Sequence, residues 1–119
     1  MRYLLMIYRD EQEWEAKSQE ERNTVFQAAV QYSEARRASG FYQGGAPLEP
    51  TGTATTVRVK GGKPVMTDGP FAETKEQLAG YTILEAKDLD EALAFVAQHP
   101  LTLAGFSIEV RPIRMGPPK

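Results

Sequence analysis

The chain has 119 residues, of which 41% are hydrophobic and 25% charged, which suits one globular domain with a single modest core. A formal net charge of −2, with scattered basic residues, argues against binding to nucleic acid or to an anionic membrane surface. The absence of cysteine excludes disulfides, thiolate catalysis, zinc fingers and iron–sulfur clusters.

The first segment, residues 2–8, predicts a β-strand. Its apolar residues are consecutive, a pattern typical of a strand that is buried on both faces. The segment is too short for the core of a signal peptide or for a membrane span, so we expect one cytoplasmic domain over residues 1–119. Residues 10–17 are charged around Trp14 and predict a turn or a short helix.

Residues 18–39 predict the first long helix. Ser18 and Glu21 have the spacing of a capping box, and Gly40 is placed to end the helix in a left-handed conformation. The Arg36–Arg37 pair lies near the expected C-terminus, where cations suit the helix dipole. One apolar stripe with helical spacing comprises Val25, Ala28, Ala29, Tyr32 and Ala35.

The middle of the chain predicts strands and a hairpin. Residues 41–48 read as a short strand interrupted by glycines. Residues 53–60 are rich in β-branched side chains, and Gly61-Gly62 is a two-residue hairpin signal that leads into residues 63–67. Pro64 indicates that this second hairpin strand is an edge or irregular.

The last part of the chain predicts a strand, a helix and a strand. Residues 81–85 form the first strand, and Asp88 to Glu91 has a second capping signature. His99 and Pro100 are expected to end the helix, and residues 107–113 alternate between apolar and polar side chains, as strands do. The expected apolar face of the helix comprises Leu89, Ala92, Leu93 and Val96.

The order strand, helix, strand, hairpin, strand, helix, strand predicts an α+β fold of the ferredoxin-like, split βαβ type. Right-handed crossovers place both helices on one face of the antiparallel sheet. The other face then exposes the apolar first strand, and large apolar patches mark interfaces. We therefore expect a symmetric homodimer that packs sheet against sheet and buries ~800 Å² per partner.

A long polar motif over residues 68–80 separates the hairpin from the next strand. Together with residues 3–8, 54–58 and 89–92, it resembles the DGPF-type, YCII-related proteins, a similarity that extends from Met1 to about Pro112. The resemblance implies a dimeric α+β barrel and a bacterial origin. For many relatives it also implies a genetic link to an alternative sigma factor.

The resemblance also implies an acid/base pair that this chain lacks. The YCII branch is proposed to use a histidine on the first helix and an aspartate near the end of the second. Residues 18–39 contain no histidine, and His99 stands before Pro100 where the aspartate is expected. Only Asp68, within the central motif, matches the family residue for residue.

The segment from Asp68 to Lys75 is the expected ligand-binding loop, since binding residues favour loops held by a scaffold. Asp68 is either an acid/base group or the acceptor of an Asx-turn hydrogen bond from the backbone two residues on, and we favour the structural role. The polar residues either hold a small ligand or form a solvated loop. The candidate ligand-binding residues are Asp68, Phe71, Glu73, Thr74 and Lys75.

His99 is the second weak catalytic candidate, beside Asp68. Its pKa lies ordinarily near neutrality, but its place in the last turn of a helix, as a cation favoured by the dipole, is a sufficient structural explanation. A further set either lines a cleft for a ring-bearing substrate or belongs to the core, the more frequent outcome. This set comprises Tyr8, Arg9, Tyr32, Tyr42 and Phe71.

Two functional hypotheses follow. The favoured one is a small-ligand-binding or regulatory dimer with a cleft near the Asp68–Lys75 loop. The alternative is a cofactor-independent acid/base enzyme, a lyase or hydrolase, that acts on a small polar or aromatic metabolite; a heme or oxygenase role would rest on fold analogy alone. No metal or organic cofactor is expected, because a single histidine and no phosphate-binding glycine loop are present.

Overall fold

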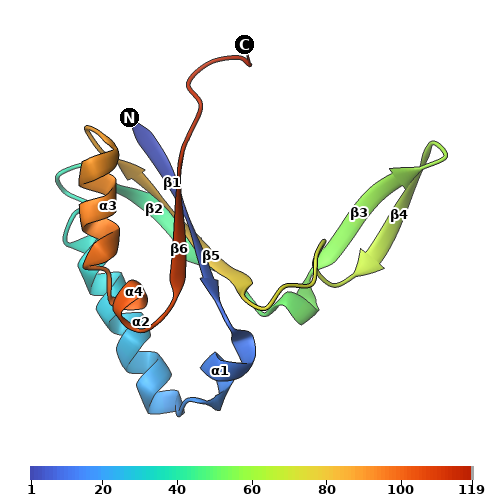
Figure 1. The fold of residues 1–119 in the computed structure, drawn as a ribbon, viewed down its shortest axis with the longest axis horizontal. Coiled ribbons are helices and arrows are strands. Elements are labelled where there is room, and N and C mark those ends of the chain that lie inside the picture. Colours follow the sequence, from blue (N-terminus) through green and yellow to red (C-terminus); the bar gives the residue numbers. More distant parts are fainter. Residues whose placement is uncertain (119) are drawn as a thin grey trace.

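The main sheet of the protein has four antiparallel strands: β1 (Arg2–Arg9), β2 (Tyr42–Pro47), β5 (Gln77–Glu85) and β6 (Ser107–Pro112). The computed structural model describes residues 1–118 and places these strands in the order β2–β5–β1–β6 (Figure 1). This order, with a helical crossover after β1 and another after β5, is the ferredoxin-like arrangement that the sequence predicts.

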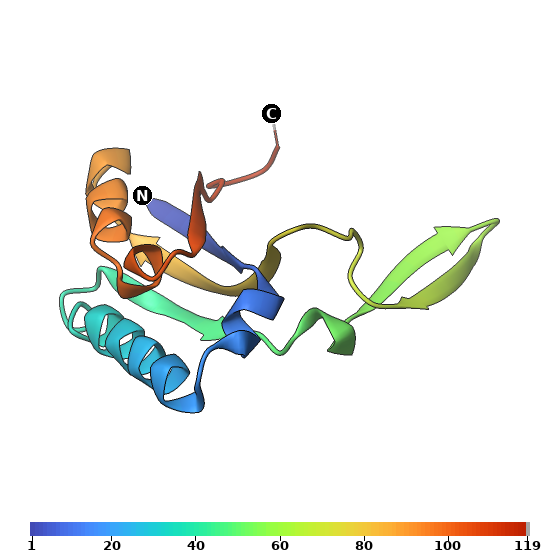
Figure 2. The ribbon, with the colours of Figure 1, turned by 60° about the horizontal axis from the view of Figure 1, so that its bottom comes forward.

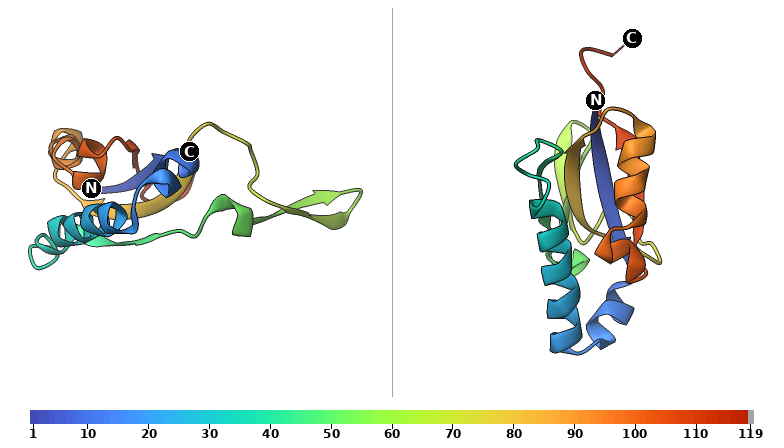
Figure 3. Two further views of the ribbon diagram at one scale, coloured as in Figure 1. Left: turned by 90° about the horizontal axis from the view of Figure 1, so that it is seen from below. Right: turned by 90° about the vertical axis from the view of Figure 1, so that its left-hand side faces the viewer.

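Helices cover one face of this sheet. The long helices α2 (Gln19–Glu34) and α3 (Leu89–Ala97) lie in front of the strands in the right panel of Figure 3. Both predicted N-caps are confirmed: the Ser18 hydroxyl accepts a hydrogen bond from the Glu21 N–H at 3.1 Å, and the Asp88 carboxylate accepts one from the Glu91 N–H at 2.9 Å. The shorter helices are α1 (Glu11–Ala16), α4 (Pro100–Leu103) and the 3-10 turn η1 (Thr51–Thr53).

α2 ends earlier than predicted. The carbonyl of Arg36 accepts a hydrogen bond from the Tyr42 N–H at 3.1 Å, and the Gly40 N–H instead donates to Arg37 at 3.0 Å, so the chain turns away from the helix axis. Gly40 has a positive φ of 84°, as predicted, but it closes this turn and not the helix. The Arg36 guanidinium donates to the Tyr32 carbonyl in the last turn, at 2.6 Å, where a cation is favourable.

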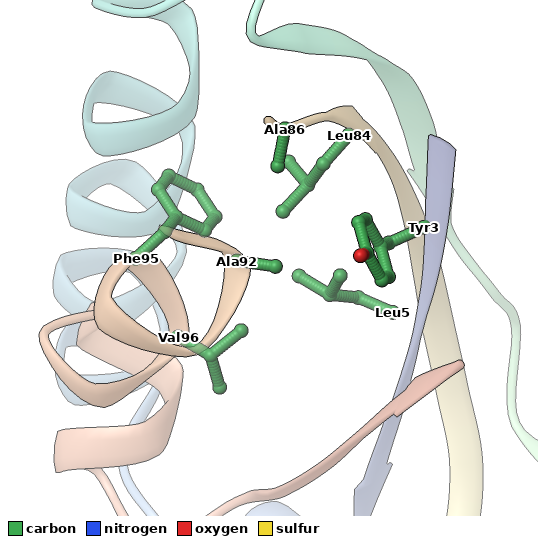
Figure 4. Close-up of a cluster of buried hydrophobic side chains, with 7 residues drawn as sticks. All are labelled: Tyr3, Leu5, Leu84, Ala86, Ala92, Phe95 and Val96. Carbon is green, nitrogen blue, oxygen red and sulfur yellow. The ribbon is translucent and has the colours of Figure 1, made fainter. Parts of the chain in front are cut away.

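The core lies between the sheet and the two long helices (Figure 4). Leu5 and Leu84, which face it from β1 and β5, are fully buried. α3 contributes Phe95, which the sequence analysis missed, whereas Leu89 and Leu93 were predicted to be buried and are exposed. The core cluster comprises Tyr3, Leu5, Leu84, Ala86, Ala92, Phe95 and Val96.

The opposite face of the sheet, here called the open face, is apolar over β1 and β5. Within the described chain, only the helix-covered side of β1 is buried, while the side chains that alternate with it are partly exposed. Three cross-strand pairs form the open face: Leu4 with Ile83, Met6 with Tyr81, and Tyr8 with Leu78.

A second, two-stranded sheet projects from the body of the protein (Figure 2). It consists of β3 (Thr55–Lys60) and β4 (Lys63–Asp68), here called the arm, and its Gly61-Gly62 turn has φ values of 57° and 79° as a hairpin turn requires. The radius of gyration is 16.4 Å, whereas a compact chain of this length has about 13.5 Å. No helix within residues 1–118 has both the length and the apolar character needed to cross a membrane.

Candidate functional site

A cavity of about 300 Å³, here called the α2 cavity, lies between α2 and the helix-covered face of the main sheet. Most of its wall is apolar, and α1, β1, β2 and β5 contribute to it besides α2. The large apolar side chains of the wall include Ile7, Trp14, Phe26, Val30, Tyr42, Leu101 and Phe106. Concave, mainly apolar sites of this size are typical of small-molecule binding.

Two glycines leave the floor of the α2 cavity without side chains. A Cβ atom on Gly45 would lie 2.2 Å from the carbonyl oxygen of Tyr81, and one on Gly80 would lie 2.9 Å from that of Ala46. Only glycine therefore permits β2 and β5 to pair this closely here. Both glycines belong to the wall of the α2 cavity.

His99 borders the α2 cavity and is 2% exposed. Its Nδ1 accepts a hydrogen bond from the Leu101 N–H at 3.1 Å, so the proton of the neutral ring resides on Nε2. Burial, aided by the positive charge of Arg36, lowers the pKa of His99 to about 4. The ring is therefore neutral at neutral pH and presents a donor rather than a free lone pair.

The prediction that His99 is a cation in the last turn of a helix is wrong. α3 ends at Ala97, and His99 is the N-cap of the next helix, α4. Pro100 occupies the first turn of α4, a position where its fixed φ and its missing N–H favour the start of a helix. The sequence signal that was expected to stop α3 instead begins α4.

Two arginines line the α2 cavity, with different surroundings. Arg37 forms a two-point ion pair with Glu34, with N–O distances of 2.7 and 2.8 Å. Arg9 lies over the Trp14 ring at 5.0 Å and forms no ion pair with any group in residues 1–118. Its Nε is buried and has no hydrogen-bond partner there.

A smaller cavity of about 220 Å³, here called the Lys75 cavity, adjoins the first, since both are lined by Arg9, Trp14 and Phe106. Lys75 and Glu76 form part of its wall. Of the five predicted ligand-binding residues, Lys75 is the one that borders either cavity.

The other four predicted ligand-binding residues are exposed. Asp68 ends β4, and Phe71 is 75% exposed with the Arg58 guanidinium 5.2 Å from its ring centre. The Thr74 hydroxyl donates to the carbonyl of Glu76, and Glu73 is exposed on the same loop. Within one chain, His99 borders the α2 cavity, whereas Asp68 borders neither cavity.

The predicted Asx turn at Asp68 is wrong. The residue two positions on is Pro70, which has no N–H to donate. Two other hydrogen bonds hold the turn: the Gly69 N–H donates to the Ala54 carbonyl at 2.7 Å, and the Thr56 hydroxyl donates to the Gly69 carbonyl at 2.9 Å.

The set of possible cleft residues divides between cavity, core and surface. Arg9 and Tyr42 line the α2 cavity. The Tyr32 hydroxyl donates to the Phe95 carbonyl at 2.7 Å, which is the structural role, and Tyr8 lies on the open face. Sequence analysis missed two buried hydroxyl residues of the wall, Ser33 and Thr82; a polar residue at a buried position of α2 or β5 was the available signal.

Comparisons with known proteins place these features in context. A family model described as the YCII-related domain matches residues 1–115. An uncharacterized protein of Rhizobium meliloti (strain 1021) is 40% identical over 126 residues, which cover 99% of this chain and 96% of the relative.

A solved structure has the same fold. The 5-chloro-2-hydroxyhydroquinone dehydrochlorinase (TftG) from Burkholderia phenoliruptrix AC1100, in complex with 2,5-dihydroxybenzoquinone, has a TM-score of 0.58 and 23% sequence identity, and the match covers 98% of this chain and 96% of that one. At this identity the likeness shows the fold alone.

Proposed function

Because the chain belongs to the YCII-related family, we propose that it is a homodimeric protein that binds a small ring-bearing molecule in the α2 cavity. The observation that carries this proposal is the cavity itself, with about 300 Å³ of space and a mainly apolar wall. An apolar cavity of ~150 Å³ holds a benzene molecule, so the α2 cavity has room for one ring with substituents. The ligand bound to the dehydrochlorinase of similar fold is also a single substituted ring.

A few polar groups in the wall can orient a bound ring. Ser33 and Thr82 bring two buried hydroxyls to the wall from α2 and β5. His99 contributes an Nε2 donor, because its Nδ1 is occupied by the Leu101 N–H. Hydroxyl or carbonyl oxygens on the ring are suitable partners for these groups.

The binding role is tested by filling the cavity. Hydroquinone and benzamide serve as probes, with binding measured by calorimetry. Ala29→Leu, on the buried side of α2, and Val30→Trp, at an exposed wall position, should each weaken binding by ~10-fold or more, because the added atoms occupy the ligand's space. Ala38→Leu, at an exposed position beyond α2, is the control and should bind as the wild type does.

Two outcomes would reject the binding site. One is unchanged affinity for the probes in both filled variants, each shown to be folded by its thermal melt. The other is the absence of probe binding to the wild-type protein at millimolar concentration.

The homodimer is proposed from the open face. Its three apolar cross-strand pairs include Leu78 and Tyr81, each 38% exposed, which a second copy can cover by two-fold packing. Light scattering should give twice the 13.2 kDa chain mass, and Met6→Glu should give the single-chain mass. Leu103→Glu, at an exposed apolar position on α4, should leave the dimer intact. A monomeric wild-type protein would reject the dimer.

Most of the predicted loop depends on the proposed dimer for contact with a ligand. Asp68, Phe71, Glu73 and Thr74 line neither cavity of their own chain, so contact with a ligand requires that a second copy bring them to it. Lys75, at the smaller cavity, can act within one chain.

A cofactor-independent acid/base enzyme is the second candidate. The name of the structural neighbour, a dehydrochlorinase, favours it. His99 lacks the free lone pair that a general base needs, so this candidate requires a carboxylate such as Asp68 of the second copy. Loss of turnover in Asp68→Asn with unchanged probe binding would support it over binding alone.

A further inference from the structure

The charges around the α2 cavity do not balance. The charged or titratable side chains in its wall, apart from that of Tyr42, belong to Arg9, Arg37, Glu34 and His99. Arg37 and Glu34 neutralise each other through two parallel N–H···O contacts, a strong geometry for this pair. His99 is neutral, because burial keeps its pKa at about 4. One positive charge, on Arg9, remains without a counterion in the cavity wall.

Arg9 is held in place by aromatic rings and not by polar partners. Its guanidinium carbon lies 5.0 Å from the centre of the Trp14 ring and 5.9 Å from that of Phe106. These two rings meet edge to face at 5.1 Å, which fixes the platform under the cation. The buried Nε has no acceptor among residues 1–118, although buried N–H groups are nearly always paired.

No acidic group near Arg9 forms an ion pair with it in residues 1–118, including Asp10, Glu13 and Glu76, which share the wall of the Lys75 cavity with Lys17 and Lys75. The Glu11 carboxylate accepts hydrogen bonds from the N–H and the hydroxyl of Thr51, at 2.8 and 2.9 Å. Glu15 is exposed and, like Glu11, forms no ion pair with Arg9 in the described chain. Arg22 adds a second positive charge to the surroundings of Arg9. Glu11 and Glu15 act on Arg9 through space, but neither carboxylate engages its N–H donors, which are therefore available to a ligand.

We infer that the α2 cavity selects a ring that carries one negative charge, a carboxylate or a phenolate, and that Arg9 binds this charged group. This inference rests on the proposed binding function. The fork of N–H donors on a guanidinium matches the two oxygens of a carboxylate. Because Arg9 borders both cavities, the anionic group lies at their junction and the ring lies in the apolar α2 cavity.

The test compares two probes of nearly the same shape, benzoate and benzamide. Calorimetry gives their affinities, and the fluorescence of Trp14, the only tryptophan of the chain, reports binding beside Arg9. The wild-type protein should bind benzoate ~10-fold tighter than benzamide or more, as expected for a charge-assisted hydrogen bond. Arg9→Gln should remove this preference, and Arg9→Lys should retain part of it because the charge remains without the fork.

A matched control removes an arginine from the same wall without changing the net charge. The double variant Glu34→Gln with Arg37→Gln deletes both members of the ion pair, so it should keep the preference for benzoate. A preference that disappears here as it does in Arg9→Gln would overturn the assignment to Arg9.

The remaining outcomes separate the inference from the function on which it rests. Equal affinity of the wild-type protein for benzoate and benzamide would overturn the anion site and leave the binding cavity standing. A benzoate preference that persists in a folded Arg9→Gln variant would also overturn it. Failure of both probes to bind at millimolar concentration would overturn the proposed function, and the anion site with it.

Discussion

Glu11 and Thr51 join the first helix to the segment that leads into the arm. The Glu11 carboxylate accepts a hydrogen bond from the Thr51 N–H at 2.8 Å and another from the Thr51 hydroxyl at 2.9 Å. The backbone N–H of Glu11 also donates to the Gln77 side chain at the start of β5, at 2.9 Å. Three separate parts of the chain therefore meet at the beginning of α1, next to Arg9.

Glu11→Ala should lower the free energy of unfolding by about 1–3 kcal/mol, because two hydrogen bonds to a carboxylate are lost. Glu13→Ala is the control, since Glu13 also stands in the first turn of α1 but its side chain is exposed. Its effect should stay within about 0.5 kcal/mol. Urea denaturation of both variants makes the comparison, and equal losses would show that the Thr51 contacts do not stabilise the fold.

His99 should make the protein less stable as the pH falls. Its pKa is about 4 in the folded chain and near the ordinary 6.5 when unfolded, so below pH 6.5 the unfolded state binds more protons. The neutral ring makes its full contribution to the free energy of unfolding above pH 6.5. This contribution is lost progressively toward pH 4, by up to about 3 kcal/mol.

His99→Asn isolates this effect. Asparagine can still cap α4 but does not titrate, so the variant should show a flatter dependence of unfolding free energy on pH between 4 and 6.5. Urea titrations at several pH values give both curves. Parallel curves for the wild type and the variant would refute the buried, neutral histidine.

Gly45→Ala should destabilise the protein by at least about 2 kcal/mol, because the new methyl group would collide with the carbonyl of Tyr81. Gly52→Ala provides the comparison, since no atom lies within 4 Å of a Cβ placed there. Its change should remain within about 0.5 kcal/mol. Thermal melts followed by circular dichroism distinguish the two, and a harmless Gly45→Ala would contradict the close pairing of β2 and β5.

Asp68→Ala and Asp68→Asn should leave the turn after β4 equally stable. The turn depends on the Gly69 N–H and on the Thr56 hydroxyl, neither of which needs the Asp68 side chain. The free energy of opening of the arm, measured by amide hydrogen exchange, should change by less than about 0.5 kcal/mol in either variant. A loss of exchange protection in Asp68→Ala alone would show that this carboxyl stabilises the turn.

Local patterns sufficed for most of the fold. The Ser18 and Asp88 caps, the Gly61-Gly62 turn and the alternation in β6 each depend on residues close in sequence, and all were predicted correctly. Arg36 shows the limit, because its carbonyl bonds to Tyr42 across a turn that no helical periodicity describes.

The candidate site was less accessible from sequence. Gly45 and Gly80 permit the close pairing of β2 and β5, and Arg9 lacks a counterion because Glu11 turns to Thr51. These facts depend on contacts between distant segments. The composition of the long motif that begins at Asp68 predicts a ligand-binding loop. Of the predicted residues, only Lys75 borders a cavity of the single chain.

The arm divides the protein into parts that need not unfold together. Within residues 1–118, β3 and β4 pair only with each other, and two-stranded hairpins are marginally stable in water. In an isolated chain the arm can therefore open while the main sheet stays folded. Trp14, the only tryptophan, lies beside the α2 cavity, so a fluorescence-monitored denaturation curve records the sheet and is blind to the arm.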